Sequence, residues 1–389
     1  MSSTERPETR TPTPRSAATP APPGSRVGEK ETLRMVSLPG LTLAVRGLRE
    51  DVTGGGGEDL GSAERSAEDQ SGAERAGTEH AGTEHAGTEH SDAGGRRGAR
   101  PRALYVHGLG GSSLNWSTLM LQLADEVAGE ALDLPGFGDS PPPDNGDYSV
   151  TGHARAVIRY LDSSGRGPVH LLGNSLGGAV VTRVAAVRPD LVRTLTLVSP
   201  ALPEIPPQRT AWPTAMLAVP GIAGLFGRLT RDWPPERRTG GILGLCYGDP
   251  GRVSPEDFAA AAEEYERRLG LPYFWDAMVR STRGVVDAYT LGGQHALWRQ
   301  AERVLAPTLL VYGGRDQLVA FRVARRACAA FRDSRLLALP DAGHVAMMEY
   351  PEVVAGAVRE LIDETARSVR RLNGQGAAPA KAPATPKGD

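Results

Sequence analysis

The stretch VHLLGNSLGGAVVTRVA, residues 169–185, joins a strand-like apolar run to a helix-like one. At the junction, GNSLG (173–177) fits the pattern G-x-S-x-G, in which glycines permit a sharp turn from strand to helix and leave the serine hydroxyl exposed. The N-terminus of the following helix favours negative charge that develops near it. We therefore expect Ser175 to be a nucleophile, although the motif alone also fits a tight turn that contains a small polar residue.

Two residues far along the chain supply the groups that a serine nucleophile needs. A serine hydroxyl reacts only when a base takes its proton and a third group orients the base. Asp316 follows the apolar run TLLVY in GGRDQ (313–317), and His344 follows LLAL in PDAGH (340–344). The chain order Ser, Asp, His is one that serine hydrolases use, and it differs from the order in other groups of these enzymes. The sequence therefore predicts a catalytic triad of Ser175, Asp316 and His344.

A glycine-rich turn, HGLGG (107–111), follows another short apolar run and can supply an oxyanion hole. Such a hole needs two backbone N–H groups, and glycines let the backbone approach a substrate carbonyl. We expect the N–H groups of Leu109 and Leu176 to fill this role, and His107 to stabilise the turn rather than act as a second base. The residues expected to contact substrate are Asn174, Gly108 and Gly110.

Short apolar runs alternate with helical patterns along most of the chain, which predicts an α/β protein with a mostly parallel sheet covered on both faces. Every candidate cluster lies at the carboxyl end of a predicted strand, where such sheets bind ligands. The expected strands are Leu33–Leu38, Leu41–Arg46, Ala103–Val106, Glu130–Leu134, Val169–Leu172, Thr194–Val198, Thr308–Tyr312 and Leu336–Leu339. The expected helices are Trp116–Val127, Val150–Leu161, Ala179–Val187 and Pro351–Arg370.

The composition divides the chain into segments of different character. The expected organisation is a disordered tail (1–30), the first strands of the core (31–50), an acidic low-complexity insert (51–100), core (101–199), a helical cap (200–304), core (305–372) and a disordered tail (373–389). The insert repeats AGTEH three times over 76–90, and the five-residue spacing of its histidines would put them on different faces of a helix. We therefore expect His80, His85 and His90 to bind no metal.

The bulk composition narrows the function classes. A formal net charge of -2 gives no argument for nucleic acid or an anionic membrane as partner. Two cysteines, Cys246 and Cys328, make neither a disulfide framework nor a zinc site, and the polar start has no apolar signal segment. The most apolar stretch, Met216–Phe226, is short and contains Pro and Gly. We expect a cytoplasmic protein with no integral membrane contact, and nothing in the insert or tails indicates a protein partner.

Taken together, the motifs resemble those of the α/β-hydrolase superfamily over residues 33–46 and 101–365. The stretches that carry the resemblance are HGLGG (107–111), DLPGFGDS (133–140), GNSLGG (173–178), GGRDQLV (313–319) and DAGHVAMMEYP (341–351). The resemblance implies a central, mostly parallel sheet with a helical cap inserted after the sixth strand. It also implies Ser175 as nucleophile, His344 as base and Asp316 as orienting acid, with no cofactor and no metal. Asp133 and Asp139 match positions that shape a turn in this family.

The substrate is less defined than the mechanism. The leading expectation is a small or medium hydrophobic carboxylic ester, cleaved through an acyl-enzyme on Ser175, with the apolar stretch Ala211–Leu229 lining a pocket mouth or packing the cap on the core. Asn174 also matches the C–C bond hydrolases of vinylogous diketones, although Val345 stands where those enzymes usually have tryptophan. Cofactor-free haloperoxidases share the triad, whereas epoxide hydrolases and haloalkane dehalogenases use an aspartate nucleophile. A non-catalytic binding protein on the same fold is the alternative from a different class.

Overall fold

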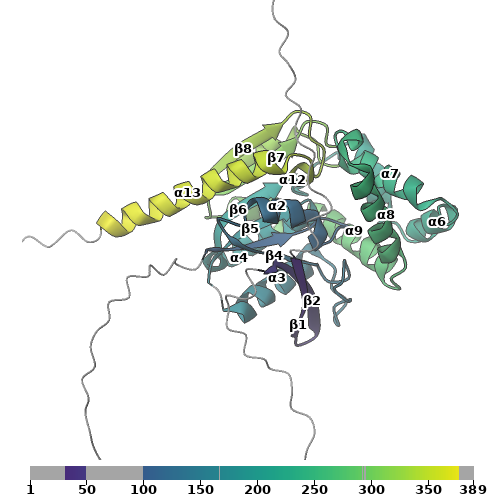
Figure 1. The fold of residues 1–389 in the computed structure, drawn as a ribbon, viewed down its shortest axis with the longest axis horizontal. Coiled ribbons are helices and arrows are strands. Elements are labelled where there is room, and N and C mark those ends of the chain that lie inside the picture. The colour runs from purple at the N-terminus through teal and green to yellow at the C-terminus, as the bar shows by residue number, and fades with distance from the viewer. Residues whose placement is uncertain (1–30, 50–99, 166, 291, 293–294, 376–389) are drawn as a thin grey trace, which may run out of the picture.

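The computed structural model describes residues 31–49, 100–165, 167–290, 292 and 295–375 (Figure 1). The predicted N-terminal tail lies outside this range, as do the AGTEH repeats and nearly all of the predicted insert and C-terminal tail. Residues 373–375, assigned to that tail by composition, instead end a long helix.

Eight strands form one sheet with the order β1-β2-β4-β3-β5-β6-β7-β8. The pairs β1–β2 and β2–β4 are antiparallel, and every later pair is parallel. The strands are β1 (Glu31–Leu38), β2 (Leu41–Leu48), β3 (Arg102–Val106), β4 (Ala128–Leu132), β5 (Val169–Asn174), β6 (Val192–Val198), β7 (Thr308–Gly313) and β8 (Ser334–Leu339).

The central strands bury both of their faces, because successive side chains point to opposite sides of a sheet. In β3, Leu104 and Val106 join one apolar cluster, whereas Ala103 and Tyr105 join the cluster on the other face. The same alternation recurs in β7. This two-sided burial explains why the strands read as short unbroken apolar runs in the sequence.

Helices cover both faces of the sheet. Helices α3, α4 and α11 contribute to one cluster, and α2, α12 and α13 contribute to the other. Figure 1 shows α13, the long yellow helix, running beside β7 and β8. The helical elements of the core are η2 (Ser113–Trp116), α2 (Ser117–Gln122), α3 (Val150–Ser164), α4 (Leu176–Val187), η3 (Pro189–Leu191), α11 (Val323–Ala330), α12 (Ala346–Glu349) and α13 (Pro351–Gln375).

The segment between β6 and β7 is helical, and we call it the cap. Within it, α9 packs on α3 and α10 packs on α4, while α5, α6 and α8 all contact α9. In Figure 1, α6, α7 and α8 stand together to one side of the sheet. The cap elements are η4 (Arg209–Ala211), α5 (Trp212–Met216), α6 (Ile222–Leu229), α7 (Pro235–Cys246), η5 (Pro250–Arg252), α8 (Pro255–Leu269), α9 (Phe274–Thr290) and α10 (Leu297–Ala301).

Helix α8 illustrates how local sequence fixes a cap element that matters for the site. Ser254 is its N-cap and accepts a hydrogen bond from the N–H of Asp257 at 3.1 Å, and proline occupies the first helical position. Acidic residues lie in the first turn, and Arg267 and Arg268 lie in the last, so both ends match the helix dipole.

The predicted architecture, a mostly parallel sheet covered on both faces with a helical cap after the sixth strand, is confirmed. Most element boundaries differ from the predicted ones by a few residues, and the helix predicted over Trp116–Val127 is only Ser117–Gln122. Two further differences bear on the site. Strand β4 ends at Leu132 rather than Leu134, because the next residue, Asp133, accepts hydrogen bonds from a turn. Helix α4 begins at Leu176, directly after the candidate nucleophile, rather than at Ala179. No helix in the described ranges is long and apolar enough to span a membrane.

Candidate active site

Ser175 occupies the turn between β5 and α4 in a conformation that side chains rarely adopt. Its φ is 54° and its ψ is -117°. The backbone on both sides holds this geometry: the N–H of Ser175 donates to the carbonyl of Val198 at 3.1 Å, and its own carbonyl accepts from the N–H of Ala201 at 2.9 Å. Strained backbone that its surroundings hold in place is typical of functional sites.

Two glycines make this turn possible. A Cβ on Gly173 would lie 2.6 Å from the carbonyl oxygen of Gly177, and a Cβ on Gly177 would lie 2.3 Å from the carbonyl oxygen of Val106. Either contact is far inside van der Waals distance. The start of α4 therefore packs directly against the end of β3, which brings Ser175 beside the HGLGG turn.

Asp316 and His344 meet at the carboxyl ends of β7 and β8. The Nδ1 of His344 lies 2.9 and 3.1 Å from the two carboxylate oxygens of Asp316, and both side chains are almost fully buried. Asp316 also accepts hydrogen bonds from the N–H groups of Leu318 and Val319. Burial by itself would raise the pKa of Asp316, but the charge and hydrogen bond of His344 and the Val319 N–H hold that pKa below its ordinary value.

This pairing fixes the orientation of the His344 ring. A carboxylate only accepts hydrogen bonds, so Nδ1 donates to Asp316. Nε2 is then the ring nitrogen left to exchange a proton with another group, which is the arrangement that a general base requires.

Asn174 links the nucleophile turn to the histidine loop. Its amide nitrogen donates to the carbonyls of Val198, at 3.1 Å, and His344, at 3.0 Å. The side chain is buried, and its oxygen lies beside Gly108, where a Cβ would come within 2.9 Å of it. The sequence suggested a substrate contact for Asn174, whereas these bonds make its amide nitrogen a structural link among three segments of the site.

The HGLGG turn presents backbone donors next to Ser175. A Cβ on Gly108 would lie 3.0 Å from the Cβ of Ser175, so the two backbones are in close contact. Within the described part of the chain, the N–H groups of Leu109 and Leu176 have no hydrogen-bond acceptor. Two free donors on either side of a nucleophile are what an oxyanion hole requires.

His107 holds this turn in place. Its Nε2 accepts from the N–H of Leu134 at 2.9 Å, so its Nδ1 carries the proton and donates to the carbonyl of Gly108 at 2.7 Å. Burial lowers the pKa of His107 even though Asp133 acts in the opposite direction. His107 therefore remains a neutral structural residue, as the sequence suggested.

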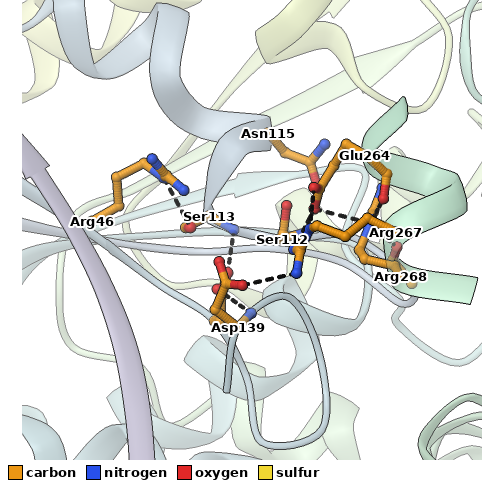
Figure 2. A network of polar contacts seen from close by, with 10 residues as sticks. Arg46, Ser112, Ser113, Asn115, Asp139, Glu264, Arg267 and Arg268 are labelled. Carbon is orange, nitrogen blue, oxygen red and sulfur yellow. Dashed lines mark hydrogen bonds and ion pairs between the residues drawn. The ribbon is translucent and has the colours of Figure 1, made fainter. Parts of the chain in front are cut away.

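Behind the turn lies a polar network that joins the core to the cap (Figure 2). The carboxylate of Asp133 accepts from the N–H groups of Ser113 and Asp139, at 2.5 and 2.8 Å. On the cap side, Arg267 pairs with Asp139 at 3.0 Å, and Arg268 donates to the carbonyl of Gly110 at 2.7 Å. The turn-shaping roles suggested for Asp133 and Asp139 agree with these contacts.

Sequence reasoning missed two residues that hold the site together. Arg268 is one, and Glu349 of α12 is the other: its carboxylate accepts from the N–H of Gly343 at 2.7 Å and from the N–H of Gly248 at 2.8 Å. Arg268 bonds a backbone group 158 residues away, and Glu349 bonds one 101 residues away besides the nearby Gly343, so no local motif reveals these links. The one available signal was a single carboxylate in the largely apolar stretch after His344.

The described residues contain no group of three or more His, Cys, Asp or Glu side chains that could hold a metal ion. Both cysteines are free thiols. Burial, with Asp316 as a lesser cause, raises the pKa of Cys246 to about 12, so this thiol is not a competing nucleophile near neutral pH.

Comparison with known proteins identifies the class. The model of the alpha/beta hydrolase family matches residues 103–357, and the chain belongs to this family. The chain has the fold of this family and the Asp–His pairing described above.

Individual relatives resemble this chain at low sequence identity. The chain is 29% identical over 263 residues to the dihydrolipoyllysine-residue acetyltransferase component of the acetoin cleaving system of Cupriavidus necator; the match covers 65% of this chain, and the chain spans only 61% of that protein. It is 27% identical over 278 residues to esterase Rv0045c of Mycobacterium tuberculosis, covering 68% of this chain and 84% of that one. The solved structure of haloalkane dehalogenase DatA from Agrobacterium tumefaciens shares the fold with a TM-score of 0.63 at 17% identity, covering 88% of this chain and all of that one.

Proposed function

We propose that this protein is a serine esterase that cleaves small or medium hydrophobic carboxylic esters. The observation that most supports this is the buried His344–Asp316 pair, 2.9 Å apart, beside the strained turn that carries Ser175. The resemblance to esterase Rv0045c agrees with ester cleavage. Met278 of α9 lies close to Gly110, where a Cβ would come within 3.1 Å of the methionine sulfur, and supplies an apolar group beside the candidate oxyanion turn.

The proposed reaction has two halves. In the first, His344 Nε2 takes the proton of the Ser175 hydroxyl, whose oxygen attacks the ester carbonyl, and the Leu109 and Leu176 N–H groups stabilise the oxyanion. Asp316 stabilises the imidazolium that forms, and His344 returns the proton to the departing alcohol. In the second half, His344 takes a proton from water, whose oxygen attacks the acyl carbonyl. The bond from the acyl carbon to the Ser175 oxygen then breaks, the acid leaves, and His344 returns the proton to the Ser175 oxygen.

A fluorophosphonate probe and a series of p-nitrophenyl esters test this proposal. We expect the probe to label the wild type but not Ser175→Ala, and we expect kcat to fall at least about ten-thousandfold in that variant. Ser163→Ala, an exposed serine on α3, is the matched control and should behave as the wild type. Folded protein that neither reacts with the probe nor turns over any ester would refute the proposal.

A vinylogous diketone assayed in parallel separates ester from C–C bond cleavage. Turnover of the diketone without turnover of any ester would show that the protein cleaves C–C bonds rather than the proposed esters. We favour the ester because the amide nitrogen of Asn174, which suggested C–C cleavage, donates to two backbone carbonyls rather than facing a substrate.

A further inference from the structure

The cap carries an apolar surface that nothing in the described chain covers. It comprises α5, α6 and the turn between them, and we call it the α5–α6 surface. Large side chains here are unusually exposed: 51% for Trp212, 52% for Leu225 and 67% for Leu229. The other exposed members are Met216, Val219 and Phe226. Sequence analysis expected this stretch to line a pocket mouth or pack on the core, yet these six side chains face solvent to a large extent.

A surface helix usually turns its apolar side toward the core, whereas α6 turns its large apolar side chains toward solvent. Leu225 and Leu229 lie one turn apart on the same side, and Phe226 lies three residues before Leu229, so the three form one exposed apolar face. The buried member of the helix is the small Ala223. Contiguous exposed apolar patches of this kind usually mark an interaction site.

Arginines flank this apolar face along the chain. Residues 205–238 contain five arginines and two acidic residues, although the whole chain has a net charge of -2. Arg209, Arg228 and Arg231 are exposed and make no ion pair or side-chain hydrogen bond with any described residue. Unpaired guanidinium groups beside large apolar side chains are complementary to a surface that is anionic outside and apolar beneath.

We propose that the α5–α6 surface docks on an anionic lipid bilayer. Leu225, Phe226 and Leu229 enter the boundary between headgroups and acyl chains, while Arg228 and Arg231 pair with lipid phosphates. The contact is peripheral, because α6 has only eight residues and lies along the bilayer rather than across it. A bilayer is favoured over a protein partner because α6 lies on the part of the cap far from the sheet (Figure 1) and the surface combines exposed apolar side chains with unpaired cations.

The position of this surface links it to the candidate active site. Helices α5 and α6 both pack on α9, and α9 also carries Met278 beside Gly110. Docking would therefore place α9 between the bilayer and the oxyanion turn. Lipid binding itself does not depend on the proposed esterase activity.

Vesicle co-sedimentation of the full chain tests the proposal. We expect binding to phosphatidylcholine vesicles that contain phosphatidylglycerol, weaker binding to phosphatidylcholine alone, and release by high salt. The double variant Arg228→Glu/Arg231→Glu should lower partitioning on the order of thirtyfold or more. The triple variant Leu225→Ser/Phe226→Ser/Leu229→Ser should lower it at least about tenfold.

Matched controls use exposed residues elsewhere. Val353→Ser on α13 and Arg299→Glu on α10 change the same kinds of side chain and should bind vesicles as the wild type does. Thermal unfolding checks that each variant is folded, so the result does not rely on catalysis. Equal binding to both vesicle types, or no binding, would overturn the proposal. So would a dimer in solution that the triple variant dissociates, because the apolar face would then belong to an interface between copies.

Discussion

Replacing Glu349 by alanine should loosen the contact between the cap and the loop that carries His344. The carboxylate is buried and bonds two backbone N–H groups: Gly343, which directly precedes His344, and Gly248, which follows α7 of the cap. His344 itself donates its N–H to the carbonyl of Cys246 at 2.7 Å, so the loop and the cap are already in contact at this point. Glu349 lies on helix α12 and bonds both the loop and the cap, so it holds that contact in place.

The size of the effect follows from the two donors left behind. A buried donor that loses its acceptor costs about 1–3 kcal/mol, so two should lower the free energy of unfolding by about 2–6 kcal/mol. Glu349→Gln keeps one acceptor oxygen but turns an amide N–H₂ toward a donor, and we expect roughly half of that loss. Misplacing a catalytic group by about 1 Å can lower a rate about a hundredfold. We therefore expect kcat to fall between about ten- and a hundredfold while KM changes little.

Urea unfolding and steady-state kinetics on a p-nitrophenyl ester measure these two effects. Glu352→Ala, an exposed carboxylate three residues later in the first turn of α13, is the control: it should lower the unfolding free energy by no more than about 1 kcal/mol and leave kcat unchanged. A Glu349→Ala variant with wild-type unfolding free energy and kcat would refute the assigned role. If only stability changed, Glu349 would support the fold without positioning His344.

The pH dependence gives a second check on Glu349. Burial raises its pKa above the ordinary value, and its N–H partners only partly oppose this. The folded state then binds the proton more tightly than the unfolded state, so this contribution to stability is fully present below the ordinary pKa. It is lost as pH rises through the raised value. The advantage of the wild type over Glu349→Gln should shrink with rising pH in that window.

Three further predictions follow from other contacts. Gly177→Ala should lower the unfolding free energy by at least about 2 kcal/mol, because the new Cβ would lie 2.3 Å from a carbonyl oxygen of β3. The control, Gly356→Ala, adds a Cβ in open space on α13 and should raise the unfolding free energy by up to about 1 kcal/mol. Urea unfolding measures both variants. Burial lowers the pKa of His153 to about 3, so protonation of the unfolded state should destabilise the wild type below about pH 6.5, by about 2 kcal/mol at pH 5. His153→Phe should lack that part of the pH dependence, and parallel urea curves at pH 7 and 5 would show it. Arg268→Met should lower kcat because it removes the donor to the oxyanion-turn carbonyl, whereas Arg267→Met should change kcat little; equal kinetics for the two would contradict the assigned contact.

Local patterns revealed the strands and the nucleophile turn because their physical causes are local. Glycines at 173 and 177 are needed within a few residues of Ser175, and two-sided burial leaves unbroken apolar runs. The contact between Asp316 and His344 could be predicted once β7 and β8 were taken as parallel neighbours, because their carboxyl ends then lie side by side. The roles of Glu349 and Arg268 were not accessible, because each depends on a backbone group brought near only by the complete fold.

The cap meets the two loops of the candidate site through charged side chains that bond backbone groups. Arg268 of α8 holds the carbonyl of Gly110 in the candidate oxyanion turn, and Glu349 joins the N–H groups of Gly343 and Gly248. Apolar contacts are non-directional and tolerate sliding, whereas hydrogen bonds lose strength when distance or angle changes. These bonds therefore set the positions of both loops rather than merely attaching the cap. It follows that variants at these contacts should act mainly on kcat, whereas variants of exposed α5–α6 residues should act on lipid binding and leave hydrolysis of a soluble ester unchanged.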